Sequence, residues 1–110
     1  MDLQPLKDFV TKHHLETQPA FSLLDIMSEL GEVAKELLKA TDYGRRPDAA
    51  DPERMREEIG DLMFAVAYLS TLYDVDPEAA MWESVRKFER RLERGSAGSE
   101  ADLGKETGME

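Results

Sequence analysis

Apolar residues recur every three or four positions along most of this chain, and short polar segments interrupt the pattern. This spacing is typical of amphipathic helices, whereas the strict alternation and tight-turn dipeptides of β-hairpins do not occur in the sequence. The helices are expected from Pro5 to about Glu16, from Ser22 to the turn at Asp42–Gly44, from Pro52 through Tyr73, and from Pro77 to about Arg94. The pattern therefore predicts an all-α fold of four helices.

Local start and stop signals support these boundaries. Asp51 and Asp76 each precede a proline, so each is expected to cap a helix whose first residue is that proline. Ser22 is followed three residues later by Asp25, which resembles a capping box. Gly44 is expected to end the second helix in a left-handed conformation.

Length and composition limit what the chain can be. A chain of 110 residues suits one domain, expected over residues 1–94, followed by a disordered acidic tail over 95–110. The net charge of −10 argues against a nucleic-acid partner, because nucleic-acid surfaces need a basic footprint. No stretch is long and apolar enough for a membrane span, and cysteine is absent. A cytoplasmic protein is expected.

Two near-duplicate acidic segments carry the candidate chemistry. Glu29 and Glu32 lie three residues apart on the second helix, and Glu58 and Asp61 repeat that spacing on the third. Residues at i and i+3 share a helix face, so two packed helices would gather four carboxylates. Such a cluster is costly without a cation, and Mg²⁺ suits an all-oxygen ligand set. The four residues are predicted to form a metal site.

The two pairs are expected to differ in their surroundings. Glu29 and Glu32 belong to an acidic stripe that lies apart from the apolar face, whereas Glu58 and Asp61 border apolar residues. The second pair is therefore expected to be rigid and desolvated, and the first pair to be exposed and to face the substrate. A glycine precedes the second acid of each pair in mid-helix, which predicts close approach of the two helices there. Glu36 continues the first stripe outside the motif and is expected either to have a structural role or to lie next to the metal ligands.

With these motifs in view, the chain resembles the MazG-like nucleoside triphosphate pyrophosphohydrolases. That family has Glu-x-x-Glu on one helix and Glu-x-x-Asp on the next, and here 25 residues separate Glu32 from Glu58. A third block, Asp76–Ala80 followed by Lys87–Arg91, looks like the last conserved helix of the family. The resemblance covers roughly residues 6–94.

The resemblance implies an all-α protein that assembles at least as a dimer and hydrolyses nucleoside triphosphates to monophosphate and pyrophosphate. It also implies Mg²⁺, with Mn²⁺ as a substitute, held by the four motif acids; in an alternative arrangement, one glutamate orients the attacking water. Hydrolysis at the α-phosphorus requires cations to neutralise the phosphates and a group to activate water. The catalytic and metal-binding residues are thus expected to be Glu29, Glu32, Glu58 and Asp61.

Further candidates lie outside the acidic segments. Lys87 and Arg91 share a line on the last helix and are candidates for phosphate contacts, although they could instead only neutralise Glu83. Phe64 and Trp82 are candidates for stacking on a base, or core residues. Apolar residues off the main stripes predict a homodimer or homotetramer.

Two other functions remain open at this stage. A phosphoribosyl-ATP pyrophosphohydrolase would keep the same helical architecture and act on a different nucleotide. A catalytically silent helical dimer would serve as an interaction module and release no pyrophosphate. The complete set of four acids argues against the silent dimer.

Overall fold

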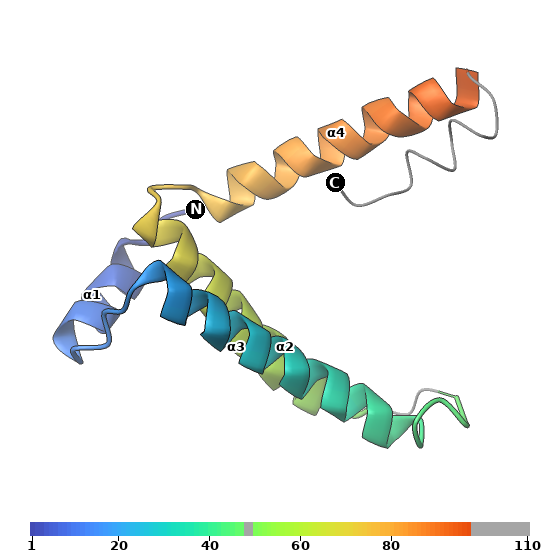
Figure 1. The fold of residues 1–110 in the computed structure, drawn as a ribbon, viewed down its shortest axis with the longest axis horizontal. Coiled ribbons are helices and arrows are strands. Elements are labelled where there is room, and N and C mark those ends of the chain that lie inside the picture. Colours follow the sequence, from blue (N-terminus) through green and yellow to red (C-terminus); the bar gives the residue numbers. More distant parts are fainter. Residues whose placement is uncertain (48–49, 98–110) are drawn as a thin grey trace. The chain divides into compact units, whose positions relative to one another are not determined.

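The computed structural model describes residues 1–47 and 50–97, and these residues form four α-helices without a strand. Figure 1 shows them in chain order: α1 (Gln4–Lys12), α2 (Pro19–Ala40), α3 (Pro52–Leu72) and α4 (Pro77–Ala97). The all-α prediction is confirmed. No helix in these ranges is both long and apolar enough to cross a membrane.

The chain divides into two compact units. One unit is Asp2–Val75 and holds α1, α2 and α3; the other contains Met1 and the chain from Asp76 onward, with α4. The predicted tail lies mostly outside the described residues, which end at 97. The predicted end of the last helix at Arg94 is wrong, since α4 continues through Gly95 to Ala97.

The aspartate–proline signals are confirmed as helix starts. The Asp51 carboxylate accepts a hydrogen bond from the Glu53 N–H at 3.0 Å, and α3 begins at Pro52. Asp76 does the same for α4, accepting from the N–H groups of Glu78 and Ala79 at 3.0 and 3.3 Å. These bonds satisfy N–H groups that the first helical turn leaves without partners.

Two other predicted boundaries are wrong. The second helix begins at Pro19, not at Ser22, because a proline in the first turn is already suited to start a helix. Ser22 therefore lies inside α2 and is only 1 % exposed. The first helix ends at Lys12 rather than Glu16, and His14 adopts a left-handed conformation with φ of 57°. The left-handed conformation predicted for Gly44 is confirmed by its φ of 85°, but its predicted capping role is wrong, because α2 ends at Ala40 with Thr41 as its C-cap and Gly44 lies in the turn that follows.

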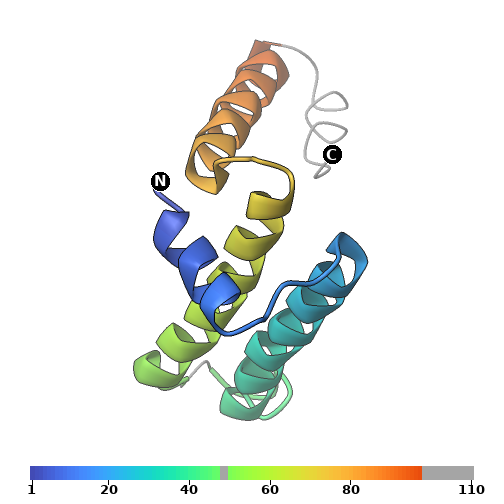
Figure 2. The ribbon, with the colours of Figure 1, turned by 90° about the vertical axis from the view of Figure 1, so that its left-hand side faces the viewer.

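In the α1–α3 unit, α2 and α3 pack side by side as a hairpin, and α1 contacts α3 (Figure 2). The side of α2 that faces α3 carries Ser22, Glu29 and Val33, which are buried or half-buried. On the α1 side, the rings of Phe9 and Phe64 meet edge to face with centroids 6.0 Å apart. Few apolar side chains are buried in the described part of the chain: Val10, Ala65 and Ala67.

The main apolar face of α2 is not the face that packs against α3. Met27 and Leu30 are 61 and 55 % exposed. Successive residues of an α-helix point about 100° apart around the helix axis. In an antiparallel pair of helices, the residues that directly follow two facing residues therefore point to the same side of the pair. Glu29 and Glu58 face each other, so Leu30 and Ile59 share one side of the hairpin, and that side is exposed. We call this side, formed by Leu23, Met27, Leu30, Ile59 and Met63, the apolar side of the hairpin.

The two mid-helix glycines do not mark close helix contact. A Cβ atom added to Gly31 or Gly60 would meet nothing within 4 Å. The predicted close approach at these positions is therefore wrong within a single chain. Both glycines lie about 160° around their helices from Glu29 and Glu58, so they point away from the α2–α3 contact.

Candidate metal centre

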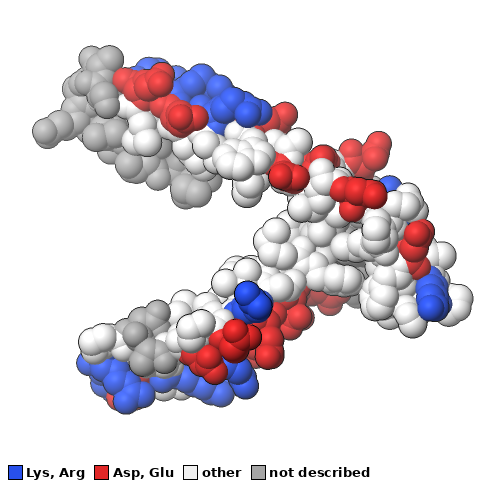
Figure 3. Space-filling view, turned by 180° about the vertical axis from the view of Figure 1, so that it is seen from behind, with Lys and Arg blue, Asp and Glu red and all other residues white. Residues whose placement is uncertain are grey.

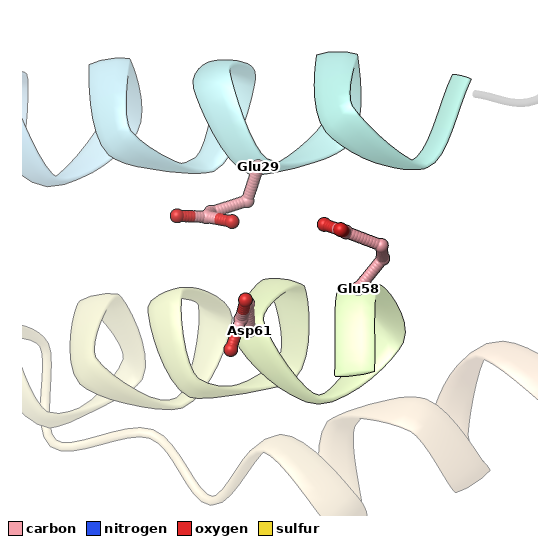
Figure 4. A group of neighbouring side chains, drawn as sticks. All are labelled: Glu29, Glu58 and Asp61. Atoms are coloured by element: carbon pink, nitrogen blue, oxygen red, sulfur yellow. The ribbon is translucent and has the colours of Figure 1, made fainter. Parts of the chain in front are cut away.

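Three of the four predicted acids converge between α2 and α3. Figure 4 shows the Glu29 carboxylate reaching from α2 toward Glu58 and Asp61 on α3. One oxygen from each of these three side chains lies within 4.8 Å of the others. Their positions follow from helical spacing, because Glu58 and Asp61 are one turn apart and Glu29 lies on the face of α2 opposite them.

Glu32 lies outside this group of three. It is exposed, one turn further along α2, and stays a predicted ligand. The sequence predicted that Glu29 and Glu32 are exposed and that Glu58 and Asp61 are desolvated, and this prediction is wrong. Instead, each helix supplies one half-buried glutamate, Glu29 or Glu58, and one exposed acid, Glu32 or Asp61. The reason is that the acidic stripe of α2, rather than its apolar face, turns toward α3.

The electrostatic environment of Glu29 is unfavourable for a lone anion. Desolvation raises the pKa of Glu29 above its ordinary value of 4.5, and the negative charges of Asp61 and Glu58 raise it further. Glu32 and Asp25 add smaller contributions of the same sign to the pKa of Glu29. A cation bound here would offset this repulsion.

An ion pair flanks the cluster. The Arg54 Nε of α3 lies 3.7 Å from the Glu36 carboxylate of α2, whose side chain is 17 % exposed. Glu36 therefore pairs with a cation across the hairpin, which agrees with its predicted structural role. The pair connects the two helices that carry the acids.

The three carboxylates fit a small divalent cation. Mg²⁺ prefers oxygen ligands in octahedral geometry, and proteins usually supply one or two carboxylates while waters and substrate phosphates fill the other positions. The convergent oxygens on two helices provide such a partial shell, with no nitrogen or sulfur ligand in the group. The donor set thus favours Mg²⁺ or Mn²⁺ over metals that prefer histidine or cysteine.

A cavity adjoins the acids, and sequence reasoning did not find it. It has a volume of about 360 Å³ and shares Glu29 and Asp61 with the acid cluster. Its other walls come from α1, the α1–α2 linker, α2 and α3: Val10, Leu15, Thr17, Ser22, Asp25, Phe64, Ala65 and Tyr68. These residues come from three helices and a linker, so no single spacing in the sequence links them. The position of Ser22, seven residues before Glu29 and hence on the same helix face, was the one available signal.

The remaining predicted site residues belong to α4. The charged groups of Lys87 and Arg91 both lie near the Phe88 ring, with the Lys87 Nζ and the Arg91 guanidinium carbon 5.1 and 5.7 Å from its centroid. Arg90 and Arg94 lie near them, and Figure 3 shows the Lys and Arg side chains gathered along this helix. The shared line of Lys87 and Arg91 is confirmed, whereas their role in phosphate binding stays a prediction.

Comparisons with known proteins agree with this picture. Residues 18–95 match the MazG nucleotide pyrophosphohydrolase domain. The nucleoside triphosphate pyrophosphohydrolase/pyrophosphatase MazG of Thermotoga maritima is 43 % identical over 47 residues, which are 43 % of this chain and 18 % of that protein. The uncharacterized protein YpjD of Bacillus subtilis is 35 % identical over 75 residues, 66 % of each chain.

The matches thus span less than two thirds of either relative's length, and no solved structure matches the chain. The family match covers most of this chain, including both acidic segments. Together with three carboxylates converging between two packed helices, it shows that this chain belongs to the MazG nucleotide pyrophosphohydrolase domain family.

Proposed function

We propose that this protein hydrolyses nucleoside triphosphates to nucleoside monophosphate and pyrophosphate in a reaction that depends on Mg²⁺, with Mn²⁺ as a substitute. The observation that carries the proposal is the convergence of Glu29, Glu58 and Asp61 within 4.8 Å, in a chain of the MazG domain family. The activity in the name of the Thermotoga relative supports the same reaction class.

The carboxylates would have two tasks. Glu29, Glu58 and Asp61, joined by Glu32, would hold the metal, which when bound would neutralise the phosphates and stabilise the charge that develops at the α-phosphorus. A carboxylate of the cluster would accept a hydrogen bond from the attacking water and orient it for in-line displacement. Without a cation, the negative cluster would repel a triphosphate, so metal binding and substrate binding would be coupled.

Lys87 and Arg91 are proposed to contact the phosphates. Both charged groups lie close to the Phe88 ring, and this contact favours holding the two cations near each other on α4. Arginine can hold a phosphate through two parallel hydrogen bonds, and lysine adds a point charge.

We also propose that the protein functions as a homodimer or homotetramer. The support is the exposed apolar side of the hairpin, where Met27 and Leu30 are 61 and 55 % exposed. Contiguous exposed apolar residues of this kind mark association surfaces in soluble proteins. A second copy of the chain offers a matching surface through a two-fold axis.

A pyrophosphate-release screen tests the proposed reaction. The purified protein is incubated with canonical and modified NTPs and dNTPs, with Mg²⁺ or with chelator, and pyrophosphate and orthophosphate are measured separately. We expect pyrophosphate from at least one nucleotide with Mg²⁺ and none with chelator. The proposal fails if no nucleotide yields pyrophosphate, or if orthophosphate is the product.

A further inference from the structure

The cavity beside the acids has both acidic and apolar walls. Glu29, Asp25 and Asp61 supply carboxylates, whereas Val10, Leu15 and Phe64 supply apolar side chains. Apolar walls with a few polar groups are typical of small-molecule sites, and a volume of about 360 Å³ is at the lower end of their range. That size suits a nucleoside better than a whole nucleoside triphosphate.

One side chain of α3 is hydrogen-bonded to the α1–α2 linker at the cavity. The Tyr68 hydroxyl of α3 accepts a hydrogen bond from the Thr17 N–H at 2.9 Å and donates one to the Thr17 carbonyl at 3.3 Å. Thr17 lies in the linker between α1 and α2, 51 residues away in sequence. Because both bonds go to main-chain atoms, they fix the path of the linker rather than the side chain of Thr17. The linker also carries Leu15, whose N–H donates a hydrogen bond to the Val10 carbonyl at 2.9 Å, so this bond and the Tyr68 bonds together hold the wall.

We propose that this cavity receives the nucleoside part of the substrate, and that Tyr68 is a positioning residue that holds the α1–α2 linker against it. The inference rests on the proposed function, since it places the phosphates of the nucleotide toward the acids. The base packs between the linker and α3, where Phe64 offers an exposed aromatic ring. A nucleoside without phosphates then binds through contacts with the apolar walls of the cavity alone.

Two variants test the two parts of this proposal. Tyr68→Phe keeps the ring and removes both bonds to the linker, and Tyr73→Phe is its control because Tyr73 is exposed and lies outside the cavity. Leu15→Trp fills the cavity, and Leu24→Trp is its control, with similar exposure and no part in the cavity walls. Thermal melts and Mn²⁺ titrations verify that each variant is folded and retains the acid cluster.

Nucleoside binding is measured by saturation-transfer NMR with adenosine, guanosine, cytidine, uridine and thymidine, in the absence of metal, and steady-state kinetics are measured with Mg²⁺ and the nucleotide that the protein turns over. We expect Leu15→Trp to abolish nucleoside binding. Tyr68→Phe should raise KM about tenfold through the loss of two hydrogen bonds, with kcat and Mn²⁺ affinity unchanged. Both control variants should match the wild type.

The outcomes separate this inference from the proposed function. Unchanged KM and nucleoside binding in both Tyr68→Phe and Leu15→Trp would overturn the cavity assignment, while pyrophosphate release by the same variants would leave the proposed reaction standing. Conversely, absence of pyrophosphate release from every nucleotide would defeat the proposed reaction, and nucleoside binding abolished by Leu15→Trp would still support the cavity. If Tyr68→Phe fails to fold, the comparison of nucleoside binding by Leu15→Trp and Leu24→Trp tests the cavity assignment by itself.

Discussion

Replacing Glu58 with glutamine should weaken the stabilisation that Mg²⁺ or Mn²⁺ gives to this protein. The three ligand oxygens lie within 4.8 Å of one another without an ion. Around Mg²⁺, with ligands at about 2.1 Å, oxygens lie about 3.0 Å apart in adjacent positions and about 4.2 Å apart in opposite positions. The oxygens therefore need to close by at most about 1.8 Å, which side-chain rotation can provide without moving the helices.

The expected size of the effect follows from binding linkage. An ion that binds only the folded state and exceeds its Kd a hundredfold adds about 2.7 kcal/mol to the free energy of unfolding. For a domain of this size, that corresponds to a rise in Tm of about 10–20 °C. Loss of one carboxylate should raise the Kd at least about tenfold, and thereby remove about 1.4 kcal/mol of the gain.

The assay is a thermal melt at increasing Mn²⁺ or Mg²⁺ concentration for wild type, Glu58→Gln and Glu57→Gln. The Glu57 variant makes the same change in charge at the neighbouring residue, which is exposed and outside the cluster. We expect Glu57→Gln to retain the full rise in Tm and Glu58→Gln to lose much of it. An equal rise in both variants, or no rise in the wild type, would refute the reasoning.

Three further predictions concern the fold and the surfaces around the cluster. Asp51→Ala removes the cap bond to Glu53 and should lower the free energy of unfolding by about 1 kcal/mol and the Tm by about 4–8 °C; a Tm that does not fall would contradict the cap assignment. Because the folded-state pKa of Glu29 is raised, its ionisation opposes folding, so Glu29→Gln should stabilise the metal-free protein at neutral pH. The extra stability of Glu29→Gln should become smaller as the pH falls through the raised pKa of Glu29 toward 4.5, and thermal melts across this pH range measure it. An extra stability that grows as the pH falls would contradict this prediction. Leu30→Glu should yield monomers in light scattering, whereas Ser28→Glu, an exposed polar position on the same helix, should not; an unchanged mass in Leu30→Glu would place the interface elsewhere.

The parts of the fold that depend on local chemistry were predictable from the sequence. Asp51 and Asp76 cap their helices because a short carboxylate next to a proline satisfies the first free N–H groups wherever it occurs. The start of α2 was mispredicted because two local signals competed, and Pro19 prevailed over the Ser22–Asp25 pattern. Ser22 therefore lies within α2 and is buried, and no local sequence rule predicts this burial.

The orientation of α2 depends on tertiary packing. Its pattern divides the helix into an apolar face and an acidic stripe, and the usual expectation is that the apolar face meets the neighbouring helix. Here the acidic stripe turns toward α3 and brings Glu29 to Glu58 and Asp61, while Met27 and Leu30 stay exposed. A repeated acidic spacing identified the candidate ligands, but only the packed pair shows that Glu32 lies outside the group of three.

The cavity depends on tertiary packing even more strongly than the orientation of α2 does, so it was harder to predict from the sequence. Thr17 and Tyr68 are 51 residues apart, and their contact depends on the path of the linker between α1 and α2. Phe64 was noted in the sequence as a candidate for base stacking, and the structure places it in the cavity wall. Nothing in the spacing of these residues could have distinguished a cavity from a closed core.

The position of oxygen incorporation during hydrolysis tests the central claim most directly. Wild-type protein is incubated with Mg²⁺ and a substrate nucleotide in ¹⁸O-labelled water, and the products are separated and weighed by mass spectrometry. Attack at the α-phosphorus places the label in the nucleoside monophosphate and leaves pyrophosphate unlabelled, and Asp61→Asn should abolish this product without unfolding the protein. Label in pyrophosphate or orthophosphate, or full turnover by Asp61→Asn, would contradict the account.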